Sequence, residues 1–342
     1  MARAGSCSDE GRRSAVLQLA QADGPLEQVY ERALERIAIM DRSGYDAVWL
    51  AEHHFTGYSV CPAVHLMAMR VAACTERLRI GTAVSLAAFY HPLRLAEEVA
   101  LLDVLTGGRV NWGAGRGFDP TEFAAFGVPI EESAERFREA VEIVLAAWTH
   151  EQLDFQGRYW GFEGVEVLPK PTQKPHPPTW VAATSPGAME WAASRGYTIL
   201  MDPHSPCTQI ARKREHYRER LEAHGHSIEG REIPMARLLA VAETEGEALE
   251  IARRGAAWTV GSYANPTKAV GIAPGTVGAG DVSRQDPVVR YLDDVVLYGT
   301  PDRLVDRLAQ LQEEMYLDYL LCAPLSHSSF TLFTDKVLPR IA

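Results

Sequence analysis

Apolar residues follow a helical period in some stretches of the chain and form short continuous runs in others. Between Leu26 and Ser43 they recur every three or four residues, which predicts an amphipathic helix ending before Gly44. The apolar run Ala47–Ala51 predicts a buried strand, and a helical stretch at 63–75 and a strand at Leu78–Ser85 follow. Helices therefore alternate with strands, as in proteins built around a parallel sheet.

The same alternation continues to the end of the chain. The further predicted strands are Ser14–Ala20, which is the least regular, Val110–Ala114, Thr179–Ala183, Thr198–Met201, Met235–Glu243 and Leu317–Cys322. The further predicted helices begin near Pro92, Glu131, Ala188, Thr208, Glu247 and Thr300. This count is close to eight strand–helix units, and we predict a single α/β domain over residues 14–342.

Three segments depart from the alternation. Residues 1–13 are polar and charged, and we expect a disordered N-terminus without a signal peptide. Residues 151–178 are rich in aromatic residues and proline and too long for an ordinary connection, so we expect a surface insertion with a small hairpin. Residues 261–286 hold five glycines and two prolines without periodicity, which is typical of a mobile lid loop or a disordered insertion.

Composition excludes several classes of protein. The net charge is −11, which argues against a nucleic acid as partner, because binding phosphates requires a basic surface. The five cysteines are scattered and form no Cys-x-x-Cys pair, as expected of reduced thiols in the cytoplasm. No apolar run reaches eighteen residues, so we expect no membrane span.

The main candidate for chemistry is Glu52-His53-His54-Phe55, which directly follows the strand Ala47–Ala51. Active sites of parallel α/β proteins lie at the carboxyl ends of strands. Successive strand residues point to opposite faces, so only one of the two histidines can face the site. Their spacing fits no metal motif, and we expect no metal. Taken alone, His53 fits a structural role at least as well as a catalytic one.

Two loops at strand ends are further candidates. Gly113–Gly117 is not a dinucleotide motif, because Phe118 stands where the third glycine belongs. Its Arg116 can meet a phosphate, or the loop is a tight turn with a surface arginine. Thr184–Ala188 lies between a strand and a helix, and is either an anion site or a serine N-cap followed by proline.

The chain resembles the bacterial luciferase-like monooxygenase family over about residues 15–325. The matching motifs are Ala51–Phe55, Gly81–Val84, His91–Arg94, Leu101–Asp103, Gly113–Gly117, Pro169–Pro171, Trp180–Ser185, Glu190–Ala193 and Tyr298–Pro301. This resemblance implies a (β/α)₈ TIM barrel that binds FMN at the carboxyl ends of its strands. It also implies that the loop at 261–286 closes over the flavin.

The resemblance assigns roles to individual residues. It places His53 beside the flavin, where it supports the formation and use of the oxygen adduct, and leaves His54 a structural role. It places a non-prolyl cis peptide, Ala83–Val84, against the isoalloxazine ring. The expected cofactor-binding residues are Ala83, Val84, Gly115, Arg116, Thr184, Ser185, Gly187, Ala188 and Met201. Gly115 stands where the luciferases carry a reactive cysteine, so light emission from an aldehyde is not implied.

The function that follows is that of an FMN-dependent, two-component monooxygenase. A separate NAD(P)H-dependent flavin reductase would supply reduced FMN, which reacts with O₂ to a C4a-(hydro)peroxyflavin that oxygenates a small organic substrate. Family members are often dimers, so we expect a homodimer. Two alternatives are an F420-dependent oxidoreductase of the same superfamily and a non-catalytic flavin-binding subunit. The Glu52–Phe55 run favours FMN over F420.

Overall fold

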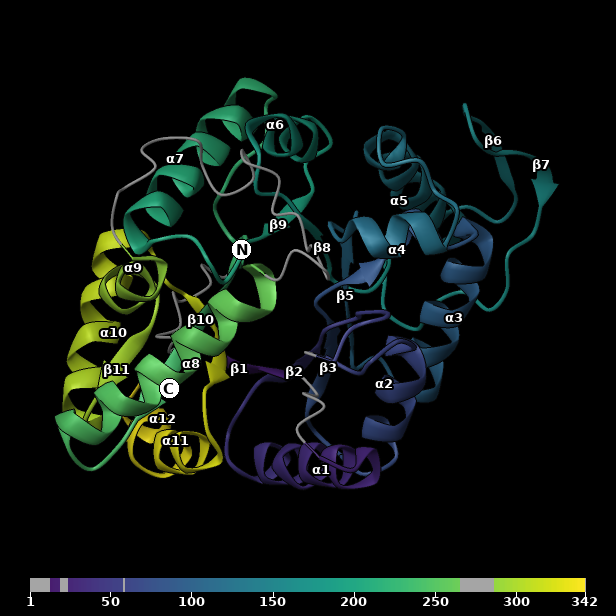
Figure 1. Cartoon of the computed structure of the whole chain (residues 1–342). Coiled ribbons are helices and arrows are strands. Elements are labelled where there is room, and N and C mark those ends of the chain that lie inside the picture. The colour runs from purple at the N-terminus through teal and green to yellow at the C-terminus, as the bar shows by residue number, and fades with distance from the viewer. Residues whose placement is uncertain (1–12, 19–23, 58, 265–285, 342) are drawn as a thin grey trace, which may run out of the picture.

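The computed structural model describes residues 13–18, 24–57, 59–264 and 286–341, which form a closed parallel (β/α)₈ barrel (Figure 1). Its strands are β1 (Arg13–Gln18), β2 (Ala47–Leu50), β3 (Arg79–Thr82), β5 (Val110–Gly115), β8 (Thr179–Ala182), β9 (Thr198–Leu200), β10 (Pro234–Val241) and β12 (Tyr319–Pro324). They pair in this order, with β12 beside β1. A bridge between Met201 and Met235 joins β9 to β10 and closes the barrel. The predicted fold class is confirmed.

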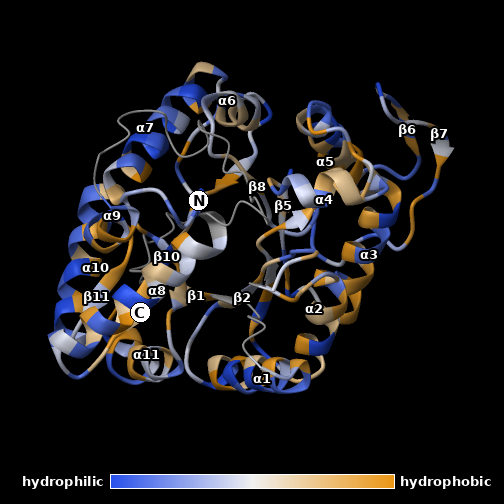
Figure 2. Ribbon diagram, in the orientation of Figure 1, coloured by the Kyte–Doolittle hydropathy of each residue, from blue (hydrophilic) through white to orange (hydrophobic). Residues whose placement is uncertain are grey.

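Helices cover the outside of this barrel. The longer ones are α1 (Leu26–Arg42), α2 (Val64–Ala72), α3 (Pro92–Leu105), α5 (Ser133–Thr149), α6 (Pro186–Ser194), α7 (Cys207–Ala223), α8 (Glu245–Ala264) and α10 (Pro301–Met315). In α1, hydrophobic and hydrophilic residues alternate in bands (Figure 2), and Val29, Ala33, Ile37 and Met40 are buried. The predicted helices are therefore present, and the buried apolar positions of α1 face the barrel.

Several short elements were not predicted. They are β4 (Ser85–Leu86), η1 (Ala87–Phe89), α4 (Pro120–Ala125), α9 (Pro287–Asp294), β11 (Leu297–Gly299), α11 (His327–Leu332), the π-helical turn η3 (Phe333–Val337) and α12 (Leu338–Ile341). Periodicity does not reveal elements this short, because it needs a window of more than ten residues. Two of them matter below: β4 extends the turn after β3, and α4 follows the glycine loop of β5.

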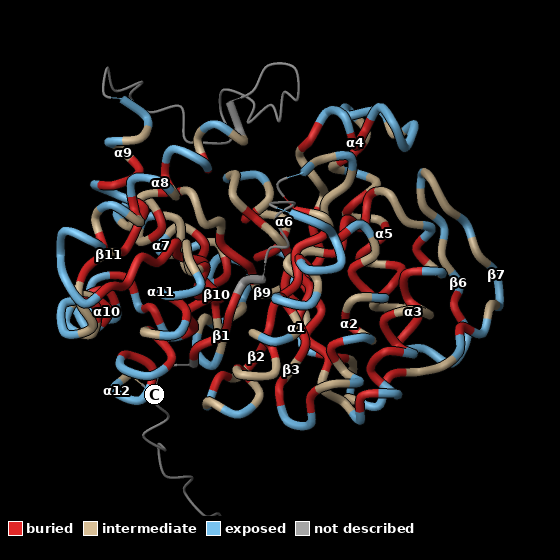
Figure 3. The backbone as a smooth tube through the Cα atoms, turned by 60° about the horizontal axis from the view of Figure 1, so that its bottom comes forward, coloured by how far each residue is buried: buried red, intermediate tan, exposed pale blue. Residues whose placement is uncertain are grey.

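The inside of the barrel is packed with side chains that alternate along each strand. In β2, Ala47 and Trp49 face inward, whereas Val48 and Leu50 join the core between the strands and the helices. Trp49 is fully buried and meets Trp180 and Tyr319 edge to face, at centroid distances of 5.2 and 6.2 Å. Buried segments run through the centre of the molecule in Figure 3, and exposed ones lie on its outside.

The three segments that interrupt the alternation agree with their predictions to different extents. The insertion contains an antiparallel hairpin, β6 (Leu153–Gln156) and β7 (Gly161–Val165), which projects beside α3 (Figure 1), as predicted. The expected disordered terminus lies outside the described residues, except for Arg13, which begins β1. Of the segment expected to form a lid, residues 261–264 form the end of α8, and Asp286 is the N-cap of α9. The rest, 265–285, lies outside the described residues.

Candidate active site

The end of β2 separates the two histidines as strand alternation requires. Counted in steps of two along the chain, His53 falls on the same side as Ala47 and Trp49, which face inward. Glu52 and His54 fall on the other side, with Val48 and Leu50. The His53 side chain is 13 % exposed, and its ring meets Phe118 edge to face at 6.0 Å. Its position is fixed by the backbone, because its N–H donates to the carbonyl of Cys61 at 3.2 Å. His53 is therefore the histidine at the mouth of the barrel.

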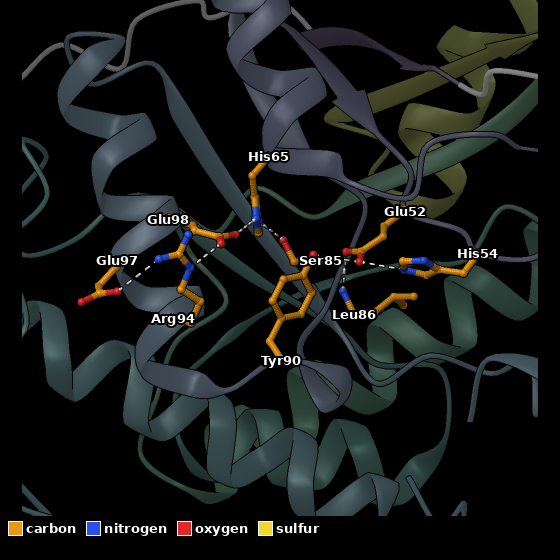
Figure 4. A network of polar contacts seen from close by, with 9 residues as sticks. All are labelled: Glu52, His54, His65, Ser85, Leu86, Tyr90, Arg94, Glu97 and Glu98. Carbon is orange, nitrogen blue, oxygen red and sulfur yellow. Dashed lines mark hydrogen bonds and ion pairs between the residues drawn. The ribbon is translucent and has the colours of Figure 1, made fainter. Parts of the chain in front are cut away.

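Hydrogen bonds to the Glu52 carboxylate connect the end of β2 with the segment that follows β3 (Figure 4). This side chain is 1 % exposed and accepts hydrogen bonds from the Leu86 N–H and the Tyr90 hydroxyl, both at 2.9 Å. Its Oε1 also lies 3.0 Å from Nε2 of His54. A buried carboxylate is stable only with such partners. Glu52 and His54 thus form the outer support of the strand end that carries His53.

A second group, His65, Ser85 and Glu98, supports the same segment from the helices (Figure 4). Nε2 of His65 lies 3.0 Å from the Ser85 hydroxyl, and its Nδ1 lies 3.0 Å from Oε2 of Glu98. The hydrogen bond from His65 holds the pKa of Glu98 below its ordinary value, although partial burial opposes this. Arg94 donates to Glu98 at 2.8 Å. The group holds β4 on the side away from the barrel interior.

The residues between β3 and β4 lie directly against β5. The Ala83–Val84 peptide bond is cis, as the resemblance implied. A Cβ at Gly115 would stand 2.2 Å from Cγ2 of Val84, and one at Gly113 would stand 2.0 Å from the carbonyl oxygen of Thr82. Neither position has room for a side chain. Glycine is therefore required here by the close approach of this turn, and the cysteine that luciferases carry at Gly115 does not fit.

The two expected phosphate-binding segments lie near neighbouring helices. Arg116 is partly buried, which lowers its pKa, and its Nη1 donates to the Ser133 hydroxyl at 3.4 Å, at the start of α5. Ser185 is the N-cap of α6 and accepts the Ala188 N–H at 3.3 Å. A Cβ at Gly187 would meet nothing within 4 Å.

The starts of α5 and α6 also contact each other directly. Arg138 of α5 donates to the Gly187 carbonyl at 3.4 Å, and Phe137 packs on Trp191 with a centroid distance of 5.6 Å. Guanidinium groups beside a helix N-terminus with an open glycine suit an anion. The start of α6 is therefore compatible with an anion, and Arg116 lies beside Ser133 at the start of the neighbouring helix α5.

Met201, another of the expected cofactor-binding residues, directly follows β9. Its side chain is buried in the core between strands and helices, whereas the preceding residue, Leu200, faces the barrel interior. The same strand end instead brings in His204, which sequence reasoning missed. Nδ1 of His204 lies 3.1 Å from the Tyr291 hydroxyl, and its backbone N–H donates to Asp202 at 3.0 Å. No local motif marks His204, because its position depends on α9, which follows 80 residues later.

Both imidazoles at the barrel mouth are neutral at pH 7. Burial, together with the charges of His54 and His204, lowers the pKa of His53 to about 3. Burial also lowers the pKa of His204 to about 4, against the opposite effect of Asp202. A neutral imidazole carries one donor and one acceptor nitrogen, so each ring can both give and take a hydrogen bond. Glu122 of α4 is a third titratable group beside His53 and was also missed from the sequence.

A polar pocket of about 530 Å³ lies at the opposite end of the barrel. Its lining includes Arg79, Thr179 and Thr198, the first residues of β3, β8 and β9. Arg79 already donates to Asn111, Gly108, Val110 and Gln173. Active sites of this fold lie at the carboxyl ends of the strands rather than at this end, so we assign the chemistry to the His53 end.

The comparison with known proteins decides the family. A model described as luciferase-like monooxygenase matches residues 13–318. The chain belongs to the luciferase-like monooxygenase family. One relative is the oxygenase component of flavin-dependent trigonelline monooxygenase of Acinetobacter baylyi, with 31 % identity over 225 residues. The match covers 65 % of this chain and 62 % of the relative. The first curated relatives are matched over 46 to 62 % of their own length.

Solved structures of luciferase-like enzymes share the fold. The oxygenating constituent of 3,6-diketocamphane monooxygenase of Pseudomonas putida, in complex with FMN, has a TM-score of 0.80 at 20 % identity. That alignment covers 97 % of this chain and 99 % of the other. An F420-dependent secondary alcohol dehydrogenase has a TM-score of 0.77 at 17 % identity, over 97 % of this chain and 100 % of the other. Both FMN and F420 are thus found on this fold.

Two searches of the described residues gave no candidate. In the described part of the luciferase-like chain, no three histidine, cysteine or acidic side chains are grouped as metal ligands. None of its described helices combines the length and the apolar character that a membrane span requires.

Proposed function

We propose that this chain is the FMN-dependent oxygenase component of a two-component monooxygenase. It would receive reduced FMN from a separate NAD(P)H-dependent flavin reductase and oxygenate a small organic substrate. The observation that carries the proposal is the arrangement at one end of the barrel. There, β2, β3, β5 and β8 present His53, the Ala83–Val84 turn, Arg116 and the Thr184–Ala188 loop. Active sites of this fold are built at that end.

Bound reduced FMN would supply the activation of dioxygen, which no side chain can perform. The protein's residues bind, orient and shield it. Arg116 and the N-terminus of α6 would hold the phosphate. The Ala83–Val84 turn presents an apolar face supported by the Trp49 cluster. Neutral His53 can donate one proton and accept another at the reacting centre.

The phosphate assignment predicts a selective loss of affinity. Arg116→Ala should weaken FMN binding by about 10- to 100-fold, since a hydrogen bond to a charged group contributes roughly 1.5–3 kcal/mol. Riboflavin, which lacks the phosphate, should bind both proteins equally. Anaerobic fluorescence titrations with reduced FMN and reduced riboflavin measure the difference. Equal affinity of wild type and Arg116→Ala for FMN would remove Arg116 from the phosphate site.

The same titration separates FMN from F420. We expect tight binding of reduced FMN and none of F420, followed by O₂ consumption with product formation when a reductase is added. Trigonelline, the compound named for the relative from Acinetobacter baylyi, is the first substrate to test. Hydride transfer from reduced F420 without O₂ would overturn the proposal. Turnover by the purified chain with a reductase alone would exclude a non-catalytic subunit.

We also propose a homodimer through α2 and α3. These helices carry hydrophobic residues along much of their length (Figure 2). Leu66 of α2 is 74 % exposed and Leu105 of α3 is 59 % exposed, and Leu101 and Val104 of α3 are exposed as well. Exposed apolar side chains grouped on adjacent helices are typical of a protein interface.

Light scattering after size-exclusion chromatography should give twice the chain mass of 37.7 kDa for wild type. Leu66→Glu combined with Leu105→Glu should give the single mass, because two buried charges would be unpaired. Leu168→Glu, at an equally exposed leucine of the insertion, is the control and should remain dimeric. A monomeric wild type would contradict the homodimer.

A further inference from the structure

Glu122 is a buried acid next to His53. It lies in α4, and its side chain is 1 % exposed. Its Oε1 accepts the backbone N–H of His54 at 2.9 Å and lies 3.9 Å from Nδ1 of His53. Its Oε2 is buried and has no hydrogen-bond partner within the described residues. A buried carboxylate oxygen without a partner is costly, which indicates a protonated acid or a role in proton transfer.

The surroundings of Glu122 favour its neutral form. Burial raises the pKa of Glu122 to about 7, and the nearby charges of Asp119 and Glu52 raise it, whereas the His54 N–H and ring lower it. For His53 the same burial acts in the other direction, because the charged form of imidazole is the protonated one. At neutral pH and below, the mobile proton of this pair therefore resides on Glu122, and His53 is the neutral imidazole beside it.

We propose that Glu122 is the proton reservoir of His53, a positioning and proton-supply residue rather than one that touches the substrate. When His53 gives its Nε2 proton to a basic oxygen at the barrel mouth, Nδ1 takes the proton of the Glu122 carboxyl. One proton leaves the ring and one enters it, so the imidazole stays neutral while Glu122 becomes a carboxylate. The return of a proton to Glu122 resets the pair.

The distance of 3.9 Å is about 1 Å longer than a hydrogen bond. Such contacts are often long in proteins without ligand and tighten in the reactive complex. The identity of the oxygen that receives the proton rests on the proposed function, but the coupling between Glu122 and His53 does not. It is a property of the protein without flavin and can be measured there.

The substitution Glu122→Gln removes the ionisable proton of Glu122 but keeps its structural role, the hydrogen bond from the His54 N–H. Glutamine keeps an acceptor oxygen for the His54 N–H and has no ionisable proton. Glu122→Asp keeps the acid on a shorter side chain and serves as the conservative rescue. Glu139→Gln is the matched control, because Glu139 also accepts backbone N–H groups, those of Arg158 and Trp160, away from the barrel mouth.

The first measurement uses the flavin-free protein. In nitrogen-15 NMR of labelled histidines, assigned with His53→Gln, the wild-type His53 ring should show an inflection near pH 7 that reports ionisation of Glu122. It should be absent in Glu122→Gln, present in Glu139→Gln and restored in Glu122→Asp. Because folding raises the pKa of Glu122, wild-type stability should also fall relative to Glu122→Gln as pH rises from about 4.5 to 7.

The second measurement follows turnover against pH. Glu122→Gln should lower kcat by about 10- to 100-fold, leave FMN affinity unchanged and remove the pH dependence near 7. An unchanged His53 titration and full kcat in Glu122→Gln would show that Glu122 only caps the His54 N–H, and would overturn the proposal. A wild type that shows the NMR coupling but binds no FMN would instead refute the proposed function alone.

Discussion

His53→Ala should lower kcat by about 10²- to 10⁴-fold, the range typical of a general acid–base residue. The ring stands at the mouth of the barrel, and burial keeps it neutral at pH 7, with one nitrogen available to donate and the other to accept. Alanine removes both functions without leaving a charge. FMN affinity should hardly change, because the proposed phosphate contacts come from the loops that follow β5 and β8.

Steady-state turnover with a reductase measures the loss of kcat. A parallel assay of peroxide and oxygenated product shows how the consumed O₂ is divided between the two. His53→Ala should release peroxide in place of oxygenated product. The matched control is His54→Gln, since His54 is the adjacent imidazole but bonds to Glu52 outside the barrel. It should lose stability and keep most of its kcat. Wild-type product yield in His53→Ala would show that His53 is structural.

The assignment of the two histidines shows how far the sequence leads. Strand alternation requires one histidine inside and one outside, and the inward phase of Ala47 and Trp49 selects His53. The same rule holds at the end of β9, where Leu200 faces inward and the next residue, Met201, faces outward. Strands, long helices and the strand-end position of the site were thus predictable from period alone.

Other features could not be derived from local patterns. Glu122 and His204 reach His53 only because α4 folds back over β2 and because α9 places Tyr291 beside β9. The glycine loop of β5 was predicted either to bring Arg116 to a phosphate or to form a tight turn. The structure adds a different cause at Gly115, the side chain of Val84 from the neighbouring turn. Contacts between segments distant in the chain decide all three.

Trp49→Ala should reduce the free energy of unfolding by about 3–5 kcal/mol, the range for removing a large buried aromatic side chain. Trp49 is fully buried inside the barrel, packs against Trp180 and Tyr319, and donates from Nε1 to the Tyr319 hydroxyl at 3.1 Å. Its ring also fills the space above Gly81, where even a Cβ would stand 2.4 Å away. Neighbouring strands cannot collapse into the resulting cavity, because their hydrogen bonds fix their spacing.

Urea unfolding measures this loss as a lower midpoint at unchanged slope. Trp49→Phe is the control: it keeps most of the ring and loses the hydrogen bond, so it should cost about 1–2 kcal/mol. Tyr319 retains its bond to Asp46 at 2.7 Å in both variants. Because Ala83 and Val84 rest on this cluster, Trp49→Ala should also weaken FMN binding, whereas Trp49→Phe should not. A loss of unfolding free energy below about 1 kcal/mol for Trp49→Ala would mean that the side chains around Trp49 repack freely.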